Sequence, residues 1–400
     1  MIQQAYIIDI LRTPVGKYGG TLATIRPDDL AAHVIKALIA RNPKLPLQLI
    51  EDVIIGAANQ AGEDNRNVAR MAGLLAGLPL ETGGVTVNRL CASGLQSIMD
   101  AARAIMLGEG AAYVAGGVES MTRAPFVTSK SETAFGRTSE TFDTTMGWRF
   151  INKSLSKLHH PYGMGETAEN VAEKWGVTRE MQDQFAFNSQ LKYKTAHEAG
   201  KFNNELVTVE VQQRKVDSII FDKDEHPRIS TIEKLASLRP AFKEGGTVTA
   251  GNSSGINDGA AASLIVNEET IKKYGLTPIA RVVSMAIAGV SPDYMGIGPV
   301  PATQKALKRA GLSMNDIDVI ELNEAFAAQS VACMNDLDLD PEKVNINGGS
   351  IAIGHPLGAS GTRISATLIH EMKKKEKAKY GLATMCIGVG QGAAMIYEKL

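Results

Sequence analysis

VTVNRLCASGLQSIMDAARAIMLGEGAAYVAGG, residues 85–117, shows the clearest alternation of strand and helix in the chain. The β-branched character of 85–88 predicts a strand, and 113–115 predicts another. Helical spacing relates the apolar side chains between them, which are Leu95, Ile98, Met99, Ala102 and Ile105. The order strand, helix, strand is the β-α-β unit of α/β proteins, and it places Cys91 in the turn where the strand leads into the helix.

The same alternation extends to both sides of this unit. Further strands are predicted at 5–8, 53–56, 263–267 and 318–322, and further helices at 27–39 and 67–75. Between about 119 and 246 the chain instead reads as polar loops around a helical stretch at 167–199. We therefore expect an inserted segment that interrupts an α/β body, at a place where a lid or a ligand-binding surface would sit.

The body itself resembles a duplication. VTVN at 85–88, followed by a small-residue turn and a helix, resembles VNIN at 344–347, followed by GGSIAIGHPLGASG and a helix. Likewise AGG at 115–117 resembles the strand end CIG at 386–388. Repeated α/β halves usually pair their sheets around a shared core. The predicted parts are an N-terminal half at 1–122 plus 249–274, an insertion at 123–248, and a C-terminal half at 275–400.

Composition excludes several classes of protein. A length of 400 residues suggests two to three domains at about 150 residues each. The net charge of -1 argues against nucleic-acid or anionic-membrane binding, so the expected partner is a small molecule. Three cysteines form no disulfide framework, which predicts free thiols and a cytoplasmic protein. No stretch is apolar enough for a membrane span, and the N-terminus reads as a strand and not as a targeting signal.

Cys91 and His355 are the first candidates for chemistry. Cys91, in NRLCASG, lies just before a helix that is expected to begin at 92 or 93, where the helix dipole and free N–H groups favour a thiolate. His355, in GGSIAIGHPLGASG, could serve as a base for a thiol. The alternatives are a buried packing cysteine and a histidine held by backbone partners. The loop lacks the Lys of a phosphate-binding P-loop.

Three further residues are weighed in the same way. Cys386, in CIGVGQG, is either an inert strand end or a thiol that the bare chain at Gly388 leaves open to a substrate. The glycine spacing there is not a dinucleotide fingerprint. Asn323, in NEAF, either caps a helix or positions a water or a carbonyl. Cys333, on the apolar face of that helix, is expected to be core.

Two other features favour no function. The adjacent His159 and His160 have no ligand spacing around them, so no metal site is predicted. The basic run KKKEKAK at 373–379 is explained by a helix C-terminus, whose dipole such residues complement.

Taken together, the motifs resemble the thiolase family of acyl-CoA:acetyl-CoA C-acyltransferases along the whole chain. The four that carry the resemblance are NRLCASG, NEAFAAQ, NGGSIAIGHPLGASG and CIGVGQG, and supporting ones include RTPVGKYGG, GGVESMTRAP, LRPAF, TAGNSSGINDGAAA and MGIGPVPA. The resemblance implies an α/β thiolase fold: two related β-α-β halves packed in a layered αβαβα arrangement, with an inserted loop domain that binds CoA.

The resemblance also implies roles for individual residues. Cys91 is the nucleophile that carries the acyl group as a thioester, and His355 takes its proton. Cys386 is the acid and base for the acetyl-CoA carbanion. One oxyanion hole is formed by His355 with a water held by Asn323, and the other by the N–H groups of Cys91 and Gly388. The implied CoA contacts are Met164, Arg228, Ala250, Ser254 and Phe326.

The implied reaction is thiolytic cleavage of a 3-oxoacyl-CoA by CoA, or the reverse Claisen condensation, as in fatty acid metabolism. CoA and acyl-CoA are substrates, no resident cofactor or metal is implied, and the expected assembly is a homo-oligomer, a dimer or a homotetramer. Gly163 stands where acetoacetyl-forming members carry a His before the Met, so the chain is more similar to degradative members, including 3-oxoadipyl-CoA thiolases.

Alternatives remain for substrate and for class. Arg149, in GWRF, could pair with a distal carboxylate or simply be a solvated loop cation. The other enzymatic alternatives are an acetoacetyl-CoA-forming acetyl-CoA acetyltransferase and a decarboxylating β-ketoacyl synthase, although the latter pairs its cysteine with two histidines. A thiolase-like lipid carrier and a basic-patch interaction protein are the non-enzymatic alternatives.

Overall fold

One continuous mixed sheet runs through the protein. The computed structural model describes residues 3–213 and 216–400. The N-terminal half supplies β1 (Tyr6–Arg12), β2 (Gly16–Lys17), β3 (Ile50–Gly56), β4 (Val85–Val87), β5 (Ala112–Ser120) and β10 (Asn257–Val266). The C-terminal half supplies β11 (Ala280–Gly289), β12 (Ile317–Leu322), β13 (Tyr380–Ile387) and β14 (Gln391–Lys399). The strands lie in the order β12-β13-β14-β11-β1-β10-β5-β3-β4, with β2 beside β10.

The pattern of parallel and antiparallel pairing is the same from either edge of the sheet to its middle, as a duplication requires. In the N-terminal half β3 pairs in parallel with β4 and β5, and β10 and β1 follow antiparallel. In the C-terminal half β12 pairs in parallel with β13 and bridges in parallel to Val344, and β14 and β11 follow antiparallel. The halves join where β1 meets β11, at Tyr6–Arg281 and Ile7–Ala280. The predicted pair of related halves is therefore confirmed.

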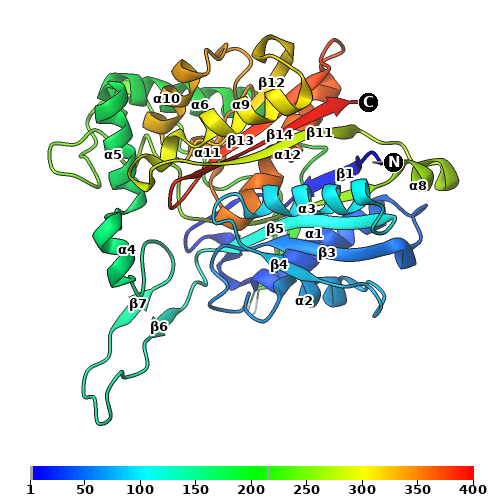
Figure 1. Cartoon of the computed structure of the whole chain (residues 1–400), viewed down its shortest axis with the longest axis horizontal. Coiled ribbons are helices and arrows are strands. Elements are labelled where there is room, and N and C mark those ends of the chain that lie inside the picture. Colours follow the sequence, from blue (N-terminus) through cyan, green and yellow to red (C-terminus); the bar gives the residue numbers. More distant parts are fainter. Residues whose placement is uncertain (1–2, 214–215) are drawn as a thin grey trace.

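Helices add three layers to the two half-sheets. Between the half-sheets lie α3 (Ser93–Leu107) and α12 (Leu357–Lys374), as Figure 1 shows. The N-terminal half is covered on its outer face by α1 (Pro27–Arg41) and α2 (Val68–Ala76), and the C-terminal half by α9 (Pro299–Ala310) and α10 (Ala327–Asp336). Separate apolar clusters fill the middle and the two outer layers. This is the αβαβα arrangement that the sequence predicted.

Glycines allow the middle layer to pack without a gap. A Cβ on Gly117 of β5 or on Gly94 of α3 would overlap the carbonyl oxygen of Gly358 in α12. Close backbone approach of this kind is possible only for glycine, because any larger residue would force the helices apart. The approach brings the N-terminal ends of α3 and α12 together, and these are the ends that follow Cys91 and His355.

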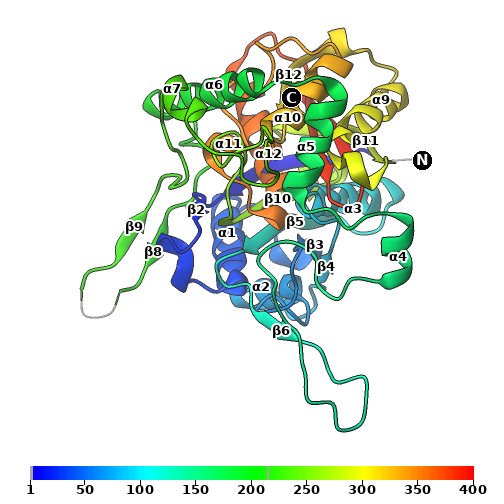
Figure 2. The same ribbon diagram turned by 90° about the vertical axis from the view of Figure 1, so that its left-hand side faces the viewer.

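The inserted segment forms helices and two projecting hairpins. Its elements are β6 (Phe126–Thr128), β7 (Thr141–Asp143), α4 (Lys153–Leu158), α5 (Met164–Trp175), α6 (Arg179–Glu198), β8 (Val209–Val211), β9 (Ile219–Phe221) and α7 (Ile232–Ala236). The remaining short helices are α8 (Glu268–Tyr274) and α11 (Ser350–Ile353). The β6–β7 and β8–β9 hairpins both extend away from the body in Figure 2. The boundaries proposed for the three parts stay a prediction.

Two segments differ from what the sequence patterns indicated. The single helical stretch at 167–199 is two helices, because Gly176 ends α5 with a φ of 63° and Thr178 caps α6. The segment 344–347, which resembles the strand predicted at 85–88, is a loop after an isolated bridge at Val344. There Asn345 has a φ of 45°, and its side-chain amide bonds both the N–H and the C=O of Leu322 at 2.9 and 2.8 Å. The backbone pairing with β12 stops after the N–H of Asn345, which bonds the carbonyl of Ile320 at 2.8 Å, and the Asn345 side chain makes the next two hydrogen bonds.

The structure also bears on membrane insertion. Of the helices in 3–213 and 216–400, none combines the length and the apolar character needed to cross a bilayer.

Candidate active site

Two strained turns face each other at the centre of the site. Cys91 lies between β4 and α3, and Leu90 before it has a φ of 48°. Gly388 follows β13, and Val389 after it has a φ of 61°. A side chain on Gly388 would contact Leu90, which brings the two turns together. Non-glycine residues rarely adopt such angles, and strain of this kind is maintained mainly where a site requires it.

The Cys91 thiol is not the activated thiolate that its position predicted. The N–H groups of Gly388 and of Cys91 itself bond the sulfur and favour the anion. Burial has the larger effect, however, and raises the pKa of Cys91 to about 11, with the nearby Glu119 carboxylate adding to the rise. Burial therefore opposes the activated thiolate that the position of Cys91 before α3 predicted. At neutral pH the resting residue is a thiol.

The pH dependence of alkylation tests this directly. We expect the rate at which iodoacetamide modifies Cys91 to keep rising between about pH 7 and pH 10, because only the thiolate reacts. The rate is measured by mass spectrometry of the Cys91 peptide. The Cys91→Ser variant supplies the background from the two buried thiols, Cys333 and Cys386. A rate that levels off below about pH 7.5 would mean an activated thiolate and would contradict the expectation.

His355 is held as a neutral base. It lies between α11 and α12, directly after Gly354, whose φ is 113°. Its N–H donates to Oδ1 of Asn257 at 2.9 Å, and its ring contacts Ser360 Oγ through Nδ1 at 2.6 Å. Burial, together with the charge of Arg363, lowers the pKa of His355 to about 3. The imidazole is therefore uncharged at neutral pH and can accept a proton.

Asn323 faces His355 and does not cap a helix. The helix that follows it is α10, which begins at Ala327 with Phe326 as its N-cap, so the capping alternative is wrong. The side-chain oxygen of Asn323 instead accepts a hydrogen bond from Ser350 Oγ at 2.6 Å. Its amide nitrogen lies 3.4 Å from Nε2 of His355. A buried amide aimed at the imidazole is suited to holding a water or a carbonyl oxygen.

The other two cysteines have different environments. Cys386 is buried at the end of β13 opposite Gly392, and its pKa is raised well above the usual range by burial and by the nearby sulfur of Cys91. Two thiols from different halves of the fold therefore lie close together. Cys333 donates to the carbonyl of Gly296 at 3.3 Å inside an apolar cluster, so the interpretation of Cys333 as a core residue agrees with its packing.

Two of the predicted CoA contacts lie next to Cys386. Met164 and Phe326 share a small apolar cluster with Cys386. Ser254 donates its N–H to the carbonyl of Ala325 at 3.0 Å, beside Phe326. Arg228 donates to the carbonyl of Ala250 at 3.0 Å. Met164 and Phe326 are therefore beside the thiol, Ser254 adjoins them, and Arg228 and Ala250 contact each other.

Several residues at the site were not singled out from the sequence. Phe242 packs edge-on against Phe326 with ring centroids 6.1 Å apart, and its motif LRPAF was the only signal for it. Glu119 is buried, accepts N–H groups from Ala58, Asn59 and Gly358, and lies near Cys91. Ser350, Ser360 and Arg363 belong to the His355 motif and its helix, but serine and arginine in a helix give no local pattern.

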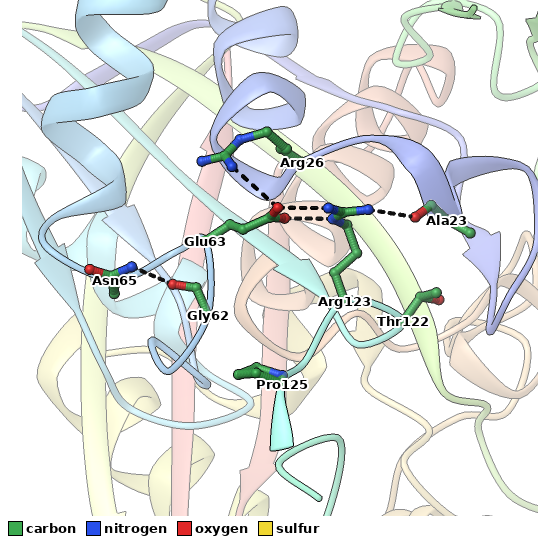
Figure 3. Close-up of a pocket in the computed structure, with 8 residues that line it drawn as sticks. All are labelled: Ala23, Arg26, Gly62, Glu63, Asn65, Thr122, Arg123 and Pro125. Atoms are coloured by element: carbon green, nitrogen blue, oxygen red, sulfur yellow. Dashed lines mark hydrogen bonds and ion pairs between the residues drawn. The ribbon is translucent and has the colours of Figure 1, made fainter. Parts of the chain in front are cut away.

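A surface hollow lies elsewhere and is not part of this site. It is lined by Ala23, Arg26, Gly62, Glu63, Asn65, Thr122, Arg123 and Pro125 (Figure 3). Glu63 pairs with Arg123 at 2.5 Å and with Arg26 at 3.2 Å. The charged side chains that line the hollow are therefore already in ion pairs with one another. Within the described part of the chain, no group of three or more His, Cys, Asp or Glu side chains is placed to hold a metal ion.

Comparison with known proteins agrees with this geometry. The family model described as "Thiolase, N-terminal domain" matches residues 5–269, and "Thiolase, C-terminal domain" matches 276–399. The chain belongs to the thiolase family. Thiolases are acyltransferases that use CoA and acyl-CoA, so the chain is an enzyme of this class and the expected fold and activity are confirmed. The lipid carrier and the interaction protein are thereby set aside.

Individual relatives resemble this thiolase over its full length. It is 54% identical to "Beta-ketoadipyl-CoA thiolase" of Acinetobacter baylyi and 49% identical to "Acetyl-CoA acetyltransferase" of Escherichia coli, with 100% of each chain covered. The crystal structure of human mitochondrial 3-ketoacyl-CoA thiolase in complex with CoA superposes with a TM-score of 0.92 at 42% identity, covering 100% of this chain and 98% of that one.

Proposed function

We propose that this thiolase cleaves a 3-oxoacyl-CoA through an acyl thioester on Cys91. The observation that carries the proposal is that two thiols from different halves of the fold, Cys91 and Cys386, lie near each other, with the N–H of Gly388 bonding the sulfur of Cys91. Sulfur is suited to this chemistry because exchange between two thioesters is nearly balanced in energy. The proposed roles of Cys91, His355, Cys386, Asn323 and Gly388 are those that the sequence motifs implied.

The proposed steps conserve atoms and protons. The sulfur of Cys91 bonds to C3 of the substrate while His355 takes the thiol proton, and the C2–C3 bond then breaks. The electron pair goes to C2 of the departing acetyl-CoA, which receives a proton from Cys386. The thiol of incoming CoA returns a proton to Cys386, and its sulfur takes the acyl group. Cys91 finally regains its proton from His355.

Neutral resting partners support this sequence of events. Because the pKa of Cys91 is raised and that of His355 is lowered, the empty site holds a thiol and a neutral imidazole and not an ion pair. Proton transfer would then accompany attack on the carbonyl, where the new oxyanion receives hydrogen bonds from the site. No resident cofactor or metal takes part in the proposed steps, and residues 123–248 are proposed to supply much of the CoA surface.

We infer that the preferred substrate is 3-oxoadipyl-CoA, also named β-ketoadipyl-CoA. The support is the 54% identity to a relative of that name and Gly163 in place of a histidine. Arg149 is the proposed partner for the distal carboxylate. It is half-buried, without a hydrogen bond or ion pair among the described residues. The indole of Trp148 donates to the carbonyl of Tyr162 at 3.0 Å, which holds this loop two residues from Met164.

A pair of six-carbon substrates tests the inference. We expect the Arg149→Gln variant to raise KM for 3-oxoadipyl-CoA about tenfold, because a charged hydrogen bond is worth about 1.5–3 kcal/mol when buried and less when half-exposed. KM for 3-oxohexanoyl-CoA, which has the same chain length without the carboxylate, should not change. Steady-state thiolysis assays measure both values. Equal effects of Arg149→Gln on KM for the two substrates would show that Arg149 does not bind the distal carboxylate.

Acetyl-CoA acetyltransferase activity is the second candidate. It is favoured by the 49% identity to the Escherichia coli enzyme of that name. The same assay with acetoacetyl-CoA separates the two, since a clear preference for acetoacetyl-CoA over 3-oxoadipyl-CoA would make it the first candidate. A β-ketoacyl synthase is disfavoured because Cys386 stands where that class carries a second histidine.

We propose that the protein is a cytoplasmic homo-oligomer, built on two exposed features. The edge strand β4 pairs only with β3 among the described residues, and Val85 in β4 and Leu80 before it are 40% and 76% exposed. The β6–β7 hairpin carries Phe126, which is 73% exposed. An open apolar edge and an exposed aromatic side chain favour pairing with a second copy. Light scattering after gel filtration distinguishes a monomer of 42.7 kDa from a dimer or tetramer.

A further inference from the structure

Arg363 is a buried cation with an unusual set of partners. It lies in α12 and is 1% exposed. Its nearest carboxylate is Glu321, at 3.6 Å, and neither Nε nor Nη1 of Arg363 has a hydrogen-bond partner among the described residues. The hydrogen bond that it does make is from Nη2 to Ser350 Oγ, at 2.5 Å. The positive charge is therefore directed at one hydroxyl group.

The Ser350 hydroxyl group in turn fixes the orientation of the Asn323 side-chain amide. Arginine can only donate, so the oxygen of Ser350 must accept from Arg363. The single hydrogen of Ser350 is then free to donate, and it points to Oδ1 of Asn323 at 2.6 Å. Because its oxygen is engaged there, Asn323 must present its amide N–H groups to Nε2 of His355.

The hydrogen bonds of the His355 imidazole run in the same donor-to-acceptor direction. An N–H donor facing Nε2 requires that Nε2 carry a lone pair, so the proton of neutral His355 resides on Nδ1. Nδ1 then donates to Ser360 Oγ at 2.6 Å, and Ser360 donates in turn to the carbonyl of Pro356 at 2.9 Å. Each group in this chain of hydrogen bonds, from Arg363 to the carbonyl of Pro356, thus donates to the next one.

We propose that Arg363 and Ser350 are positioning residues that set the tautomer of His355, leaving Nε2 free to accept a proton. The proposal rests on the proposed role of His355 as the base for Cys91. With the opposite tautomer, Nε2 would already carry hydrogen and the amide of Asn323 would turn its oxygen toward the imidazole. Nε2 could then not take the proton of a reacting thiol, and Asn323 would direct its oxygen, and not its N–H groups, toward the imidazole.

The Ser350→Ala variant tests the proposal. It removes the hydroxyl between Arg363 and Asn323 and leaves every group of the proposed reaction in place. We expect kcat for thiolysis to fall about ten- to a hundredfold while KM for the acyl-CoA stays within about twofold, as for a lost interaction that matters in the transition state. Ser350→Thr, which keeps the hydroxyl, should restore kcat. Ser365→Ala is the matched control, since Ser365 is a buried hydroxyl on α12 outside this chain of bonds.

Nitrogen NMR supplies a readout that is independent of activity. The protein is labelled with 15N at Nδ1 of histidine, and the His355 signal is assigned by its loss in His355→Gln. In the wild type we expect a protonated Nδ1, and in Ser350→Ala a mixture with bare Nδ1. Ser365→Ala should match the wild type.

The outcomes separate this proposal from the one that it rests on. A bare Nδ1 in the wild type would overturn the proposal by itself, even if Ser350→Ala fails to fold. An unchanged tautomer together with unchanged kcat in Ser350→Ala would also overturn it. A protonated Nδ1 in a protein whose His355→Gln variant keeps full activity would instead refute the role of His355 as the base.

Discussion

Replacing Cys91 with alanine is expected to lower kcat for thiolysis by about 10⁴-fold or more, because the acyl group then has no sulfur to occupy between the two half-reactions. The fold should not change, since Cys91 lies in the turn between β4 and α3 and alanine is only slightly smaller than cysteine. The measurement is thiolysis of 3-oxoadipyl-CoA, followed by mass spectrometry of the protein after incubation with acetyl-CoA. Wild-type protein should carry an acetyl group on the Cys91 peptide.

Cys333→Ala is the matched control for this experiment. It also removes a thiol, but one that lies on the buried face of α10 and bonds to the backbone of Gly296. It should lose some stability and keep its activity. An acetyl group on a residue other than Cys91, or a Cys91→Ala variant that still cleaves its substrate at the wild-type rate, would refute Cys91 as the nucleophile.

Replacing Cys386 with alanine should divide the reaction into its two parts. Proton transfer to and from C2 of acetyl-CoA is expected to fall by about 10²- to 10⁴-fold, the usual contribution of a positioned acid or base. Transfer of an acetyl group from acetyl-CoA to Cys91 breaks no carbon–carbon bond, so it should survive. The raised pKa of Cys386 agrees with this role, because a neutral thiol is the form that can protonate a departing carbanion.

Two assays on one Cys386→Ala sample measure the two parts. The first follows acetylation of Cys91 by mass spectrometry, and the second follows exchange of deuterium from solvent into the methyl group of acetyl-CoA. Cys386→Ser retains a weaker acid in the same place and should lose exchange as well. Equal loss of acetylation and exchange would indicate that Cys386 acts by holding Cys91 in place and not by moving a proton.

Much of the fold and of the site could be predicted from local pattern. Strand and helix periodicity around 85–117 and the small-residue turns at Cys91 and Gly388 are properties of short segments, and such segments keep their character in the folded chain. The core role of Cys333 could be read in the same way, from its place on an apolar helix face. The single helix expected at 167–199 failed at Gly176, because one residue with positive φ outweighs the helical character around it.

Charge and hydrogen bonding could not be read locally. The sequence argument for an activated Cys91 considered the helix N-terminus and could not include burial, which raises the pKa of the thiol to about 11. The capping interpretation of Asn323 failed for a related reason, since its partner Ser350 lies 27 residues further along the chain.

The sequence alone therefore determined most of the elements that form and the repeat between the two halves, because periodicity and motif spacing are short-range properties. Its resemblance to thiolases named the three side chains that are proposed to carry the chemistry. Only the tertiary structure decided the protonation of those side chains and the direction of the bonds from Arg363 to His355. Both depend on which distant groups exclude water from the site and on which of them can only donate a proton, and these relations arise when the two halves of the sheet close around α3 and α12.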